Sequence, residues 1–271
     1  MSGTVTDDAT PVLEVRGLTV RYGGVVAVDG VDLTVGDGEI VGLIGPNGAG
    51  KTSWIDAVTG FHRPAGGSVR FAGSDVTDAS PHARARAGFV RTFQRLDLFE
   101  DLTVRQNLLV GASTPTWRDT LLDALWPRHH DEEGVDEALA LLGLDDVAER
   151  NPAELSNGQR HLVALGRALA ARPRLVLLDE PAAGLDEAES AALGLLLHDV
   201  RERGTAILLV DHDMALVLGV CDRVAVLDLG RCIATGRPAD VRANPEVVAA
   251  YLGTEGHRTG ETERDDREGG A

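Results

Sequence analysis

The stretch Gly45-Pro46-Asn47-Gly48-Ala49-Gly50-Lys51-Thr52 decides the fold, because it matches G-x-x-x-x-G-K-[ST], the pattern of a phosphate-binding loop. Lys51 is also the only lysine in the chain, whose other basic side chains are all arginine. A loop that folds backbone amides around phosphates has room for the compact ammonium of lysine and little for a broad, planar guanidinium. The position of the one lysine therefore indicates a phosphate site with a steric requirement.

The residues on both sides of this loop provide the expected context. Residues 39–44 have the pattern of a short buried strand, and residues 52–59 have that of a helix ended by Gly60. Backbone amides and a helix N-terminus together form a concave anion site. We expect Lys51 to neutralise the β- and γ-phosphates of a nucleoside triphosphate, and the Thr52 hydroxyl to coordinate Mg²⁺. The predicted nucleotide-binding residues here are Gly45, Pro46, Asn47, Gly48, Ala49, Gly50, Lys51, Thr52 and Ser53.

A second motif places two carboxylates at the end of an apolar run. Residues 175–178 are all leucine or valine, and Asp179 and Glu180 follow them. Ligands of parallel sheets gather at the carboxyl ends of the strands, so this pair should face the same crevice as the glycine loop. Asp179 suits the metal shell, directly or through water. Glu180 suits a general base or a residue that orients water.

The remaining pattern predicts an α/β fold. Apolar and polar residues alternate over 12–35 with a turn at Tyr22-Gly23-Gly24, which favours antiparallel strands, and further strands are expected at 206–210 and 224–227. Residues from about 80 to 172 have helical spacing, including a helix expected at 118–127 and another at 160–170. Strands that alternate with helices predict a mixed or parallel sheet. We expect a flexible N-terminus at 1–11, one domain at 12–253 and a disordered acidic tail at 254–271.

Composition narrows the class of protein. The chain is 43% hydrophobic and 25% charged, with a net charge of −17, and such an acidic chain is a poor candidate for binding nucleic acid. No run approaches the roughly 18 apolar residues of a membrane span. The N-terminus lacks the basic and apolar regions of a signal peptide, so we expect a cytoplasmic location. Cys221 and Cys232 fit no metal spacing and are expected to be reduced thiols.

The sequence Leu155-Ser156-Asn157-Gly158-Gln159 resembles the LSGGQ signature of ATP-binding-cassette (ABC) ATPases, and the resemblance extends over about residues 12–253. It implies an ABC-type P-loop NTPase with an N-terminal antiparallel β part and an α-helical subdomain. It also implies that Ser156 and Gly158, with Gln159 beside them, contact an ATP held mainly by a partner subunit. Asn157 stands where the family has glycine, and asparagine tolerates positive φ better than most residues.

The same resemblance implies roles at four further positions. Gln94 matches the Q-loop glutamine, which touches the metal or the attacking water, and His212 matches the switch histidine at the γ-phosphate. Asp186 matches the D-loop, and Tyr22 matches the aromatic residue that stacks on adenine, near the region of Val28. The implied catalytic residues are thus Glu180, His212 and Gln94. The implied metal ligands are Thr52, Gln94 and Asp179, and the implied cofactors are ATP and Mg²⁺.

Finer motifs are similar to the ATPase subunits of bacterial branched-chain amino acid importers, and Arg91-Thr92-Phe93-Gln94 points to the longer of their two cassette types. Residues 98–104, 179–186 and 250–253 carry the same similarity. It implies an ATPase that powers transport, peripheral on the inner face of the cell membrane. Its partners would be a second ABC ATPase subunit, identical or different, and integral membrane permeases. The alternatives are an ABC ATPase that serves urea, amide or lipopolysaccharide transport, a non-transport ABC ATPase, and a P-loop kinase or GTPase.

Overall fold

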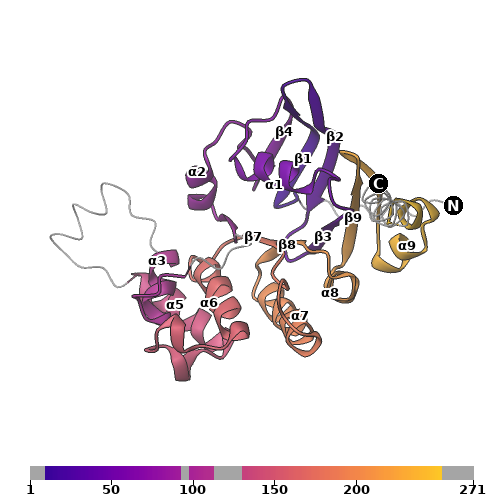
Figure 1. The fold of residues 1–271 in the computed structure, drawn as a ribbon. Coiled ribbons are helices and arrows are strands. Elements are labelled where there is room, and N and C mark those ends of the chain that lie inside the picture. The colour runs from indigo at the N-terminus through magenta and orange to yellow at the C-terminus, as the bar shows by residue number, and fades with distance from the viewer. Residues whose placement is uncertain (1–9, 93–97, 113–129, 252–271) are drawn as a thin grey trace, which may run out of the picture.

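Two β-sheets and a set of helices make up the protein, seen here as a computed structural model that describes residues 10–92, 98–112 and 130–251 (Figure 1). The smaller sheet is antiparallel and has the order β2-β1-β4-β5. Its strands are β1 (Leu13–Tyr22), β2 (Val25–Val35), β4 (Gly66–Phe71) and β5 (Ser74–Asp75). The expected turn at Tyr22-Gly23-Gly24 joins β1 to β2, which confirms the N-terminal antiparallel part.

The larger sheet has the order β10-β9-β3-β8-β7-β6. Neighbouring strands from β9 to β6 are parallel, and β10 pairs with β9 antiparallel, so the sheet is mixed. Its strands are β3 (Ile40–Ile44), β6 (Phe89–Arg91), β7 (Leu175–Asp179), β8 (Ala206–Val210), β9 (Arg223–Asp228) and β10 (Arg231–Gly236). The predicted α/β class is confirmed.

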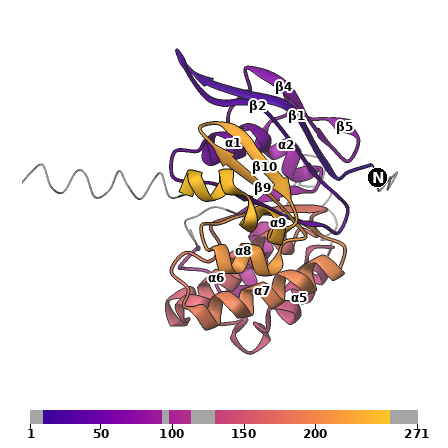
Figure 2. The same ribbon diagram turned by 90° about the vertical axis from the view of Figure 1, so that its right-hand side faces the viewer.

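The helices lie mainly on one side of the larger sheet, opposite the smaller sheet, as both views show (Figures 1 and 2). The α-helices are α1 (Lys51–Thr59), α2 (Pro81–Arg86), α3 (Val104–Ala112), α5 (His130–Leu142), α6 (Asn157–Leu169), α7 (Glu187–Glu202), α8 (Met214–Val220) and α9 (Pro238–Ala243). Two 3₁₀ turns, Asp145–Val147 and Pro152–Glu154, lie between α5 and α6. No helix in the described part of the chain is long and apolar enough to cross a membrane.

The larger sheet separates two hydrophobic cores. Along β3, Ile40 and Ile44 face the core shared with the helices, whereas Val41 and Leu43 face the core shared with β1 and α1. The same alternation holds along β7, β8 and β9. Because both faces are covered, these strands appear in the sequence as continuous apolar runs rather than alternating ones. Burial on both faces places the carboxyl ends of the strands, and the loops that follow them, at fixed positions.

The stretch expected to be helical also contributes a strand. β6 pairs with β7 at the edge of the larger sheet, with Arg91 opposite Leu177. Three residues carry no recognisable period, so the sequence pattern does not predict this strand. Helix α6 begins at Asn157, earlier than the expected residue 160, because the Ser156 side chain caps it. The helix expected at 118–127 and the tail at 254–271 lie outside the described residues.

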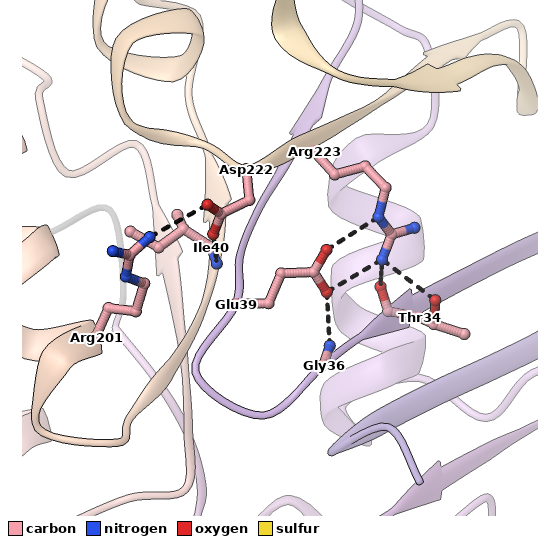
Figure 3. A network of polar contacts seen from close by, with 7 residues as sticks. All are labelled: Thr34, Gly36, Glu39, Ile40, Arg201, Asp222 and Arg223. Atoms are coloured by element: carbon pink, nitrogen blue, oxygen red, sulfur yellow. Dashed lines mark hydrogen bonds and ion pairs between the residues drawn. The ribbon is translucent and has the colours of Figure 1, made fainter. Parts of the chain in front are cut away.

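A polar network joins the starts of β3 and β9 to the end of β2 (Figure 3). Arg223 donates to both carboxylate oxygens of Glu39, at 3.0 and 3.2 Å, and to the carbonyl of Thr34 at 2.7 Å. Asp222 accepts from the Ile40 amide at 2.9 Å and pairs with Arg201. This network ties the two sheets together at the amino ends of β3 and β9. The glycine loop follows the opposite, carboxyl end of β3.

Candidate functional site: a phosphate loop beside two carboxylates

The glycine loop connects β3 to α1 through a backbone that only glycine adopts readily. Gly45, Gly48 and Gly50 all have positive φ, and Gly50 is the residue before α1. A Cβ atom on Gly50 would lie 2.4 Å from the carbonyl oxygen of Ala27, so the two segments touch backbone to backbone. The first turn of α1 carries no acidic residue. No side-chain charge in this turn therefore offsets the positive end of the helix dipole, and the N-terminal amides of α1 favour an anion.

Lys51 is folded back over this loop. Its Nζ atom donates to the carbonyl of Gly45 at 2.6 Å and to that of Pro46 at 3.1 Å. Burial lowers the pKa of Lys51 from the ordinary 10.5, an effect that the nearby carboxylates of Glu180 and Asp179 partly offset. The ammonium is thus bound by the loop carbonyls and lies within electrostatic reach of the two acids.

A cavity of about 440 Å³ opens over the loop. It brings together the predicted residues 47–53 and Glu180, and adds residues that the sequence did not single out: Val25, Val26, Ala27, Leu229 and Gly230. Val25 and Leu229 are apolar but 67% and 82% exposed. Apolar residues at a turn are the sequence signal that could have identified them as part of a binding surface. Gly230 donates to Ala49 at 2.9 Å, so the β9–β10 turn supports the loop.

Asp179 is the last residue of β7, and Glu180, which follows it, lines this cavity. Glu180 has a positive φ of 52°, and its amide donates to the Val210 carbonyl at 2.7 Å, which fixes the backbone at the end of the sheet. Such a conformation costs a non-glycine residue free energy and is typical of functional positions. Asp179 accepts from Arg91 at 2.8 Å, with both side chains largely buried. The sequence shows Arg91 only as the first residue of the motif at 91–94 and assigns it no role.

His212 follows β8, the strand next to β7. Its side chain is 70% exposed, with Nδ1 3.5 Å from Asp211 Oδ1. The carboxylate of Asp211 is fully buried and accepts from the amides of Ala182 and Asp213, at 3.1 and 2.9 Å. Asp211 therefore holds the loop after β7 against the loop after β8. His212 is not part of the cavity lining but extends from this tied pair of loops.

The signature loop lies apart from the cavity. Ser156 caps α6 by accepting from the Gln159 amide at 3.2 Å, and the Gln159 side chain accepts from the Ser156 amide at 3.0 Å. Asn157 has a helical backbone, so its tolerance of positive φ is not used; its side chain instead donates to the Gly184 carbonyl at 3.1 Å. None of the described residues 155–159 lines the cavity over Lys51.

The other predicted positions are distributed around these groups. Asp186 caps α7, accepting from the Glu189 amide at 2.8 Å. The Tyr22 ring is 46% exposed and lies 4.7 Å from the ring of His62, outside the cavity lining. Gln94, predicted as both a catalytic residue and a metal ligand, lies outside the described residues.

The oxygen ligands available here suit Mg²⁺. Thr52 lines the cavity, and Asp179 precedes Glu180, which also lines it. A hydroxyl and a carboxylate are therefore available as metal ligands. The described residues hold no group of three or more histidine, cysteine, aspartate or glutamate side chains that could form a metal cage. Mg²⁺ is ordinarily held by one or two carboxylates together with substrate phosphates, so this sparse set fits a metal that arrives with a nucleotide.

Two protein-family models match parts of this chain. The ABC transporter family model matches residues 28–183, and that of the branched-chain amino acid ATP-binding cassette transporter matches residues 231–257. Two similar proteins are high-affinity branched-chain amino acid transport ATP-binding proteins. BraF of Pseudomonas aeruginosa is 39% identical over 257 residues, covering 90% of this chain and 98% of BraF. LivG of Escherichia coli is 40% identical over 251 residues, with the same shares covered.

Two solved structures of ATP-binding cassettes resemble this chain closely. The ADP conformation of an ATP-binding cassette of an ABC transporter has a TM-score of 0.81 and 31% identity, covering 90% of this chain and 100% of that chain. A nucleotide-free cassette has a TM-score of 0.79, again with 31% identity, and covers 89% of this chain and 99% of that chain. The predicted enzyme class, an ATPase coupled to transport, is confirmed by the family match. The chain belongs to the ABC transporter family, as one of its ATP-binding cassettes.

Proposed function

We propose that this chain binds and hydrolyses ATP to power a membrane importer of branched-chain amino acids. The observation that carries the proposal is that one cavity is lined both by residues 47–53 of the phosphate loop and by Glu180. A phosphate-binding surface and a candidate base therefore face the same space. The match of residues 231–257 to the branched-chain amino acid family, and the near full-length similarity to BraF and LivG, support the substrate class.

The proposed chemistry assigns each cavity residue a task. The loop amides and the α1 N-terminus hold the phosphates, and Lys51 leaves its intraloop carbonyl partners to neutralise the β- and γ-phosphates. Glu180 orients a water molecule against the γ-phosphorus and accepts its proton, as the bond to the bridging oxygen breaks. Thr52, Asp179 and Gln94 would hold Mg²⁺, which would supply positive charge to offset the charge that develops on the phosphates.

A complete site needs a second cassette, in this proposal. Ser156, Gly158 and Gln159 do not line the cavity of their own chain, whereas the α6 N-terminus suits contact with phosphate. We therefore place them, with Asp186, at the ATP of a partner subunit in a head-to-tail dimer, homomeric or heteromeric. His212 contacts the γ-phosphate and Tyr22 stacks on adenine. Closing and opening of the dimer moves permease subunits in the membrane, with this chain on the inner face.

Glu180→Gln tests the hydrolytic step. The amide keeps the shape of the side chain but cannot take a proton, so the variant should bind ATP, lose turnover and accumulate an ATP-bound dimer. Phosphate release and light scattering after size-exclusion chromatography measure the two effects. Glu202→Gln, an exposed change at the end of α7, is the matched control and should behave as wild type. Wild-type turnover in Glu180→Gln would remove Glu180 from the role of base.

Uptake by cells tests the substrate class. A strain that lacks this chain should lose uptake of labelled leucine, isoleucine and valine, and expression of wild type but not of Lys51→Met should restore it. Unchanged leucine uptake with lost urea or amide uptake would assign the chain to one of the alternative importers. A soluble complex with nucleic acid, and no effect on uptake, would favour a non-transport ABC ATPase.

A further inference from the structure

Arg91 joins three elements around the end of β7. From the last position of β6, it donates to Asp179 Oδ2 at 2.8 Å and to Asp56 Oδ1 at 2.6 Å. A further contact of 3.4 Å reaches the Thr59 hydroxyl, and the guanidinium carbon lies 5.7 Å from the centre of the Phe61 ring. One arginine thus connects β6, β7 and the phosphate-loop helix α1.

The ion pairs of Arg91 with Asp56 and Asp179 are largely removed from water. The side chains of Arg91 and Asp179 are 10% and 15% exposed, and that of Asp56 is 31% exposed. Exposed ion pairs contribute little, but removing one partner of a buried pair leaves an uncompensated charge. The planar guanidinium can bind two carboxylates at once in a fixed geometry, which a lysine ammonium on a flexible stem does not reproduce. The position of Asp179 therefore depends on an arginine here.

The partner on α1 gives this connection a direction. Asp56 is four residues after Thr52, so the two side chains lie on the same face of α1, one turn apart. Through Asp56, Arg91 fixes Asp179 relative to the turn of helix that carries Thr52. Thr52 and Asp179 are the two described residues proposed to hold Mg²⁺. The bridge therefore sets the spacing between the two halves of the metal site.

We propose that Arg91 is a positioning residue for metal-dependent ATP hydrolysis, which holds the Asp179 carboxylate at the correct place relative to Thr52. The proposal rests on the proposed function, because it takes Asp179 and Thr52 as metal ligands. Arg91 occupies one oxygen of Asp179 and restricts rotation of the carboxylate, as residues behind a metal ligand commonly do. In this proposed role, Arg91 acts through Asp179 and does not contact the phosphates.

Arg91→Met is the principal test. Positioning predicts that the Mg²⁺ concentration giving half-maximal ATP hydrolysis rises by about tenfold, the lower end of the effect of removing such supporting residues. Charge alone predicts the opposite sign, because loss of a cation leaves Asp56 and Asp179 more attractive to Mg²⁺. Binding of a fluorescent ATP analogue, titrated with Mg²⁺, gives a second readout without turnover. In EDTA, the affinity of the variant for the nucleotide should match wild type.

Three further variants separate positioning from general stability. Arg91→Lys keeps the charge, so it should recover part of the melting temperature but not the Mg²⁺ dependence. Asp56→Asn weakens the anchor on α1 and should shift the Mg²⁺ dependence in the same direction, by less. Arg223→Met breaks the partly buried pair with Glu39 at the other end of the sheet (Figure 3), and is the matched control. It should lower the melting temperature and leave the Mg²⁺ dependence unchanged.

The possible results are distinct. A raised Mg²⁺ requirement in Arg91→Met and Asp56→Asn, and not in Arg223→Met, supports the proposal. An unchanged or lowered requirement in the two site variants overturns it, as does full recovery in Arg91→Lys. If Arg91→Met does not fold, Arg91→Lys decides, because it keeps the charge and changes only the geometry. Failure of wild type itself to bind or hydrolyse ATP with Mg²⁺ would instead overturn the proposed function.

Discussion

Lys51→Arg keeps the charge at the phosphate loop and changes only the shape of the cation. The Lys51 ammonium lies within a single turn of loop, 2.6 and 3.1 Å from the carbonyls of Gly45 and Pro46. A guanidinium is longer and planar and presents its donors as a fixed fork. It cannot occupy the same position without opening the loop. We expect weaker nucleotide binding even though the charge is conserved.

The size of the loss follows from the contacts. A hydrogen bond to a charged group contributes about 1.5–3 kcal/mol. Lys51 makes two such bonds to loop carbonyls in the nucleotide-free protein. We propose that it replaces them with hydrogen bonds to phosphate oxygens when ATP binds. Losing the equivalent of one such bond, at about 1.4 kcal/mol for each tenfold change, raises the Kd for ATP by roughly 10- to 100-fold. Lys51→Met loses the charge as well and should bind at least as weakly.

The pH dependence gives a second, independent signature. Burial lowers the pKa of Lys51, so the wild-type ammonium loses its proton at a lower pH than an ordinary lysine, whose pKa is 10.5. ATP affinity should therefore fall as the pH rises through this lowered pKa. An arginine in this place stays charged over the same range. Lys51→Arg should bind weakly at neutral pH but show no alkaline decline of its own.

Fluorescent nucleotide titrations from pH 7 upward, with melting temperatures measured alongside, check both effects. Arg16→Met removes an exposed charge on β1 that does not line the cavity, so it is a control for the loss of charge in Lys51→Met. A Kd for Lys51→Arg equal to that of wild type would refute the steric argument. A parallel alkaline decline in both proteins would show that a group other than Lys51 causes it.

The remaining predictions concern the loop backbone and the thiols. Gly48→Ala and Gly50→Ala both place alanine at positive φ, at a cost of about 1–2 kcal/mol, but only the second puts a Cβ 2.4 Å from a backbone oxygen. Gly50→Ala should therefore lower the melting temperature of the nucleotide-free protein clearly more than Gly48→Ala, and equal losses would contradict the close approach of Gly50 to Ala27. Burial, with a smaller contribution from Asp222, raises the pKa of the Cys221 thiol to about 12, whereas Cys232 is exposed. A thiol reagent at pH 8 should label one cysteine in the folded protein and two after denaturation, and rapid labelling of both would disprove the burial of Cys221.

Much of the site was predictable where contiguous residues carry it. The phosphate loop and α1 follow β3 directly, and Gly60 ends the helix as expected. The apolar runs of β7, β8 and β9 were recognisable because strands buried on both faces need continuous apolar sequence. The role of Asn157 was not, since its backbone is helical and its side chain contacts Gly184, 27 residues away.

By itself, the sequence determined the phosphate loop, the strand that precedes it and the helix that follows, because local spacing specifies backbone conformation and the burial of each strand. Only the tertiary structure decided which distant residues meet there. Arg91 reaches Asp56 across 35 positions and Asp179 across 88, through a three-residue strand at the edge of the sheet. Leu229 and Gly230 reach the cavity through the β9–β10 turn. The physical reason is that a period of two residues says which face of a strand is buried, but not which strand lies beside it.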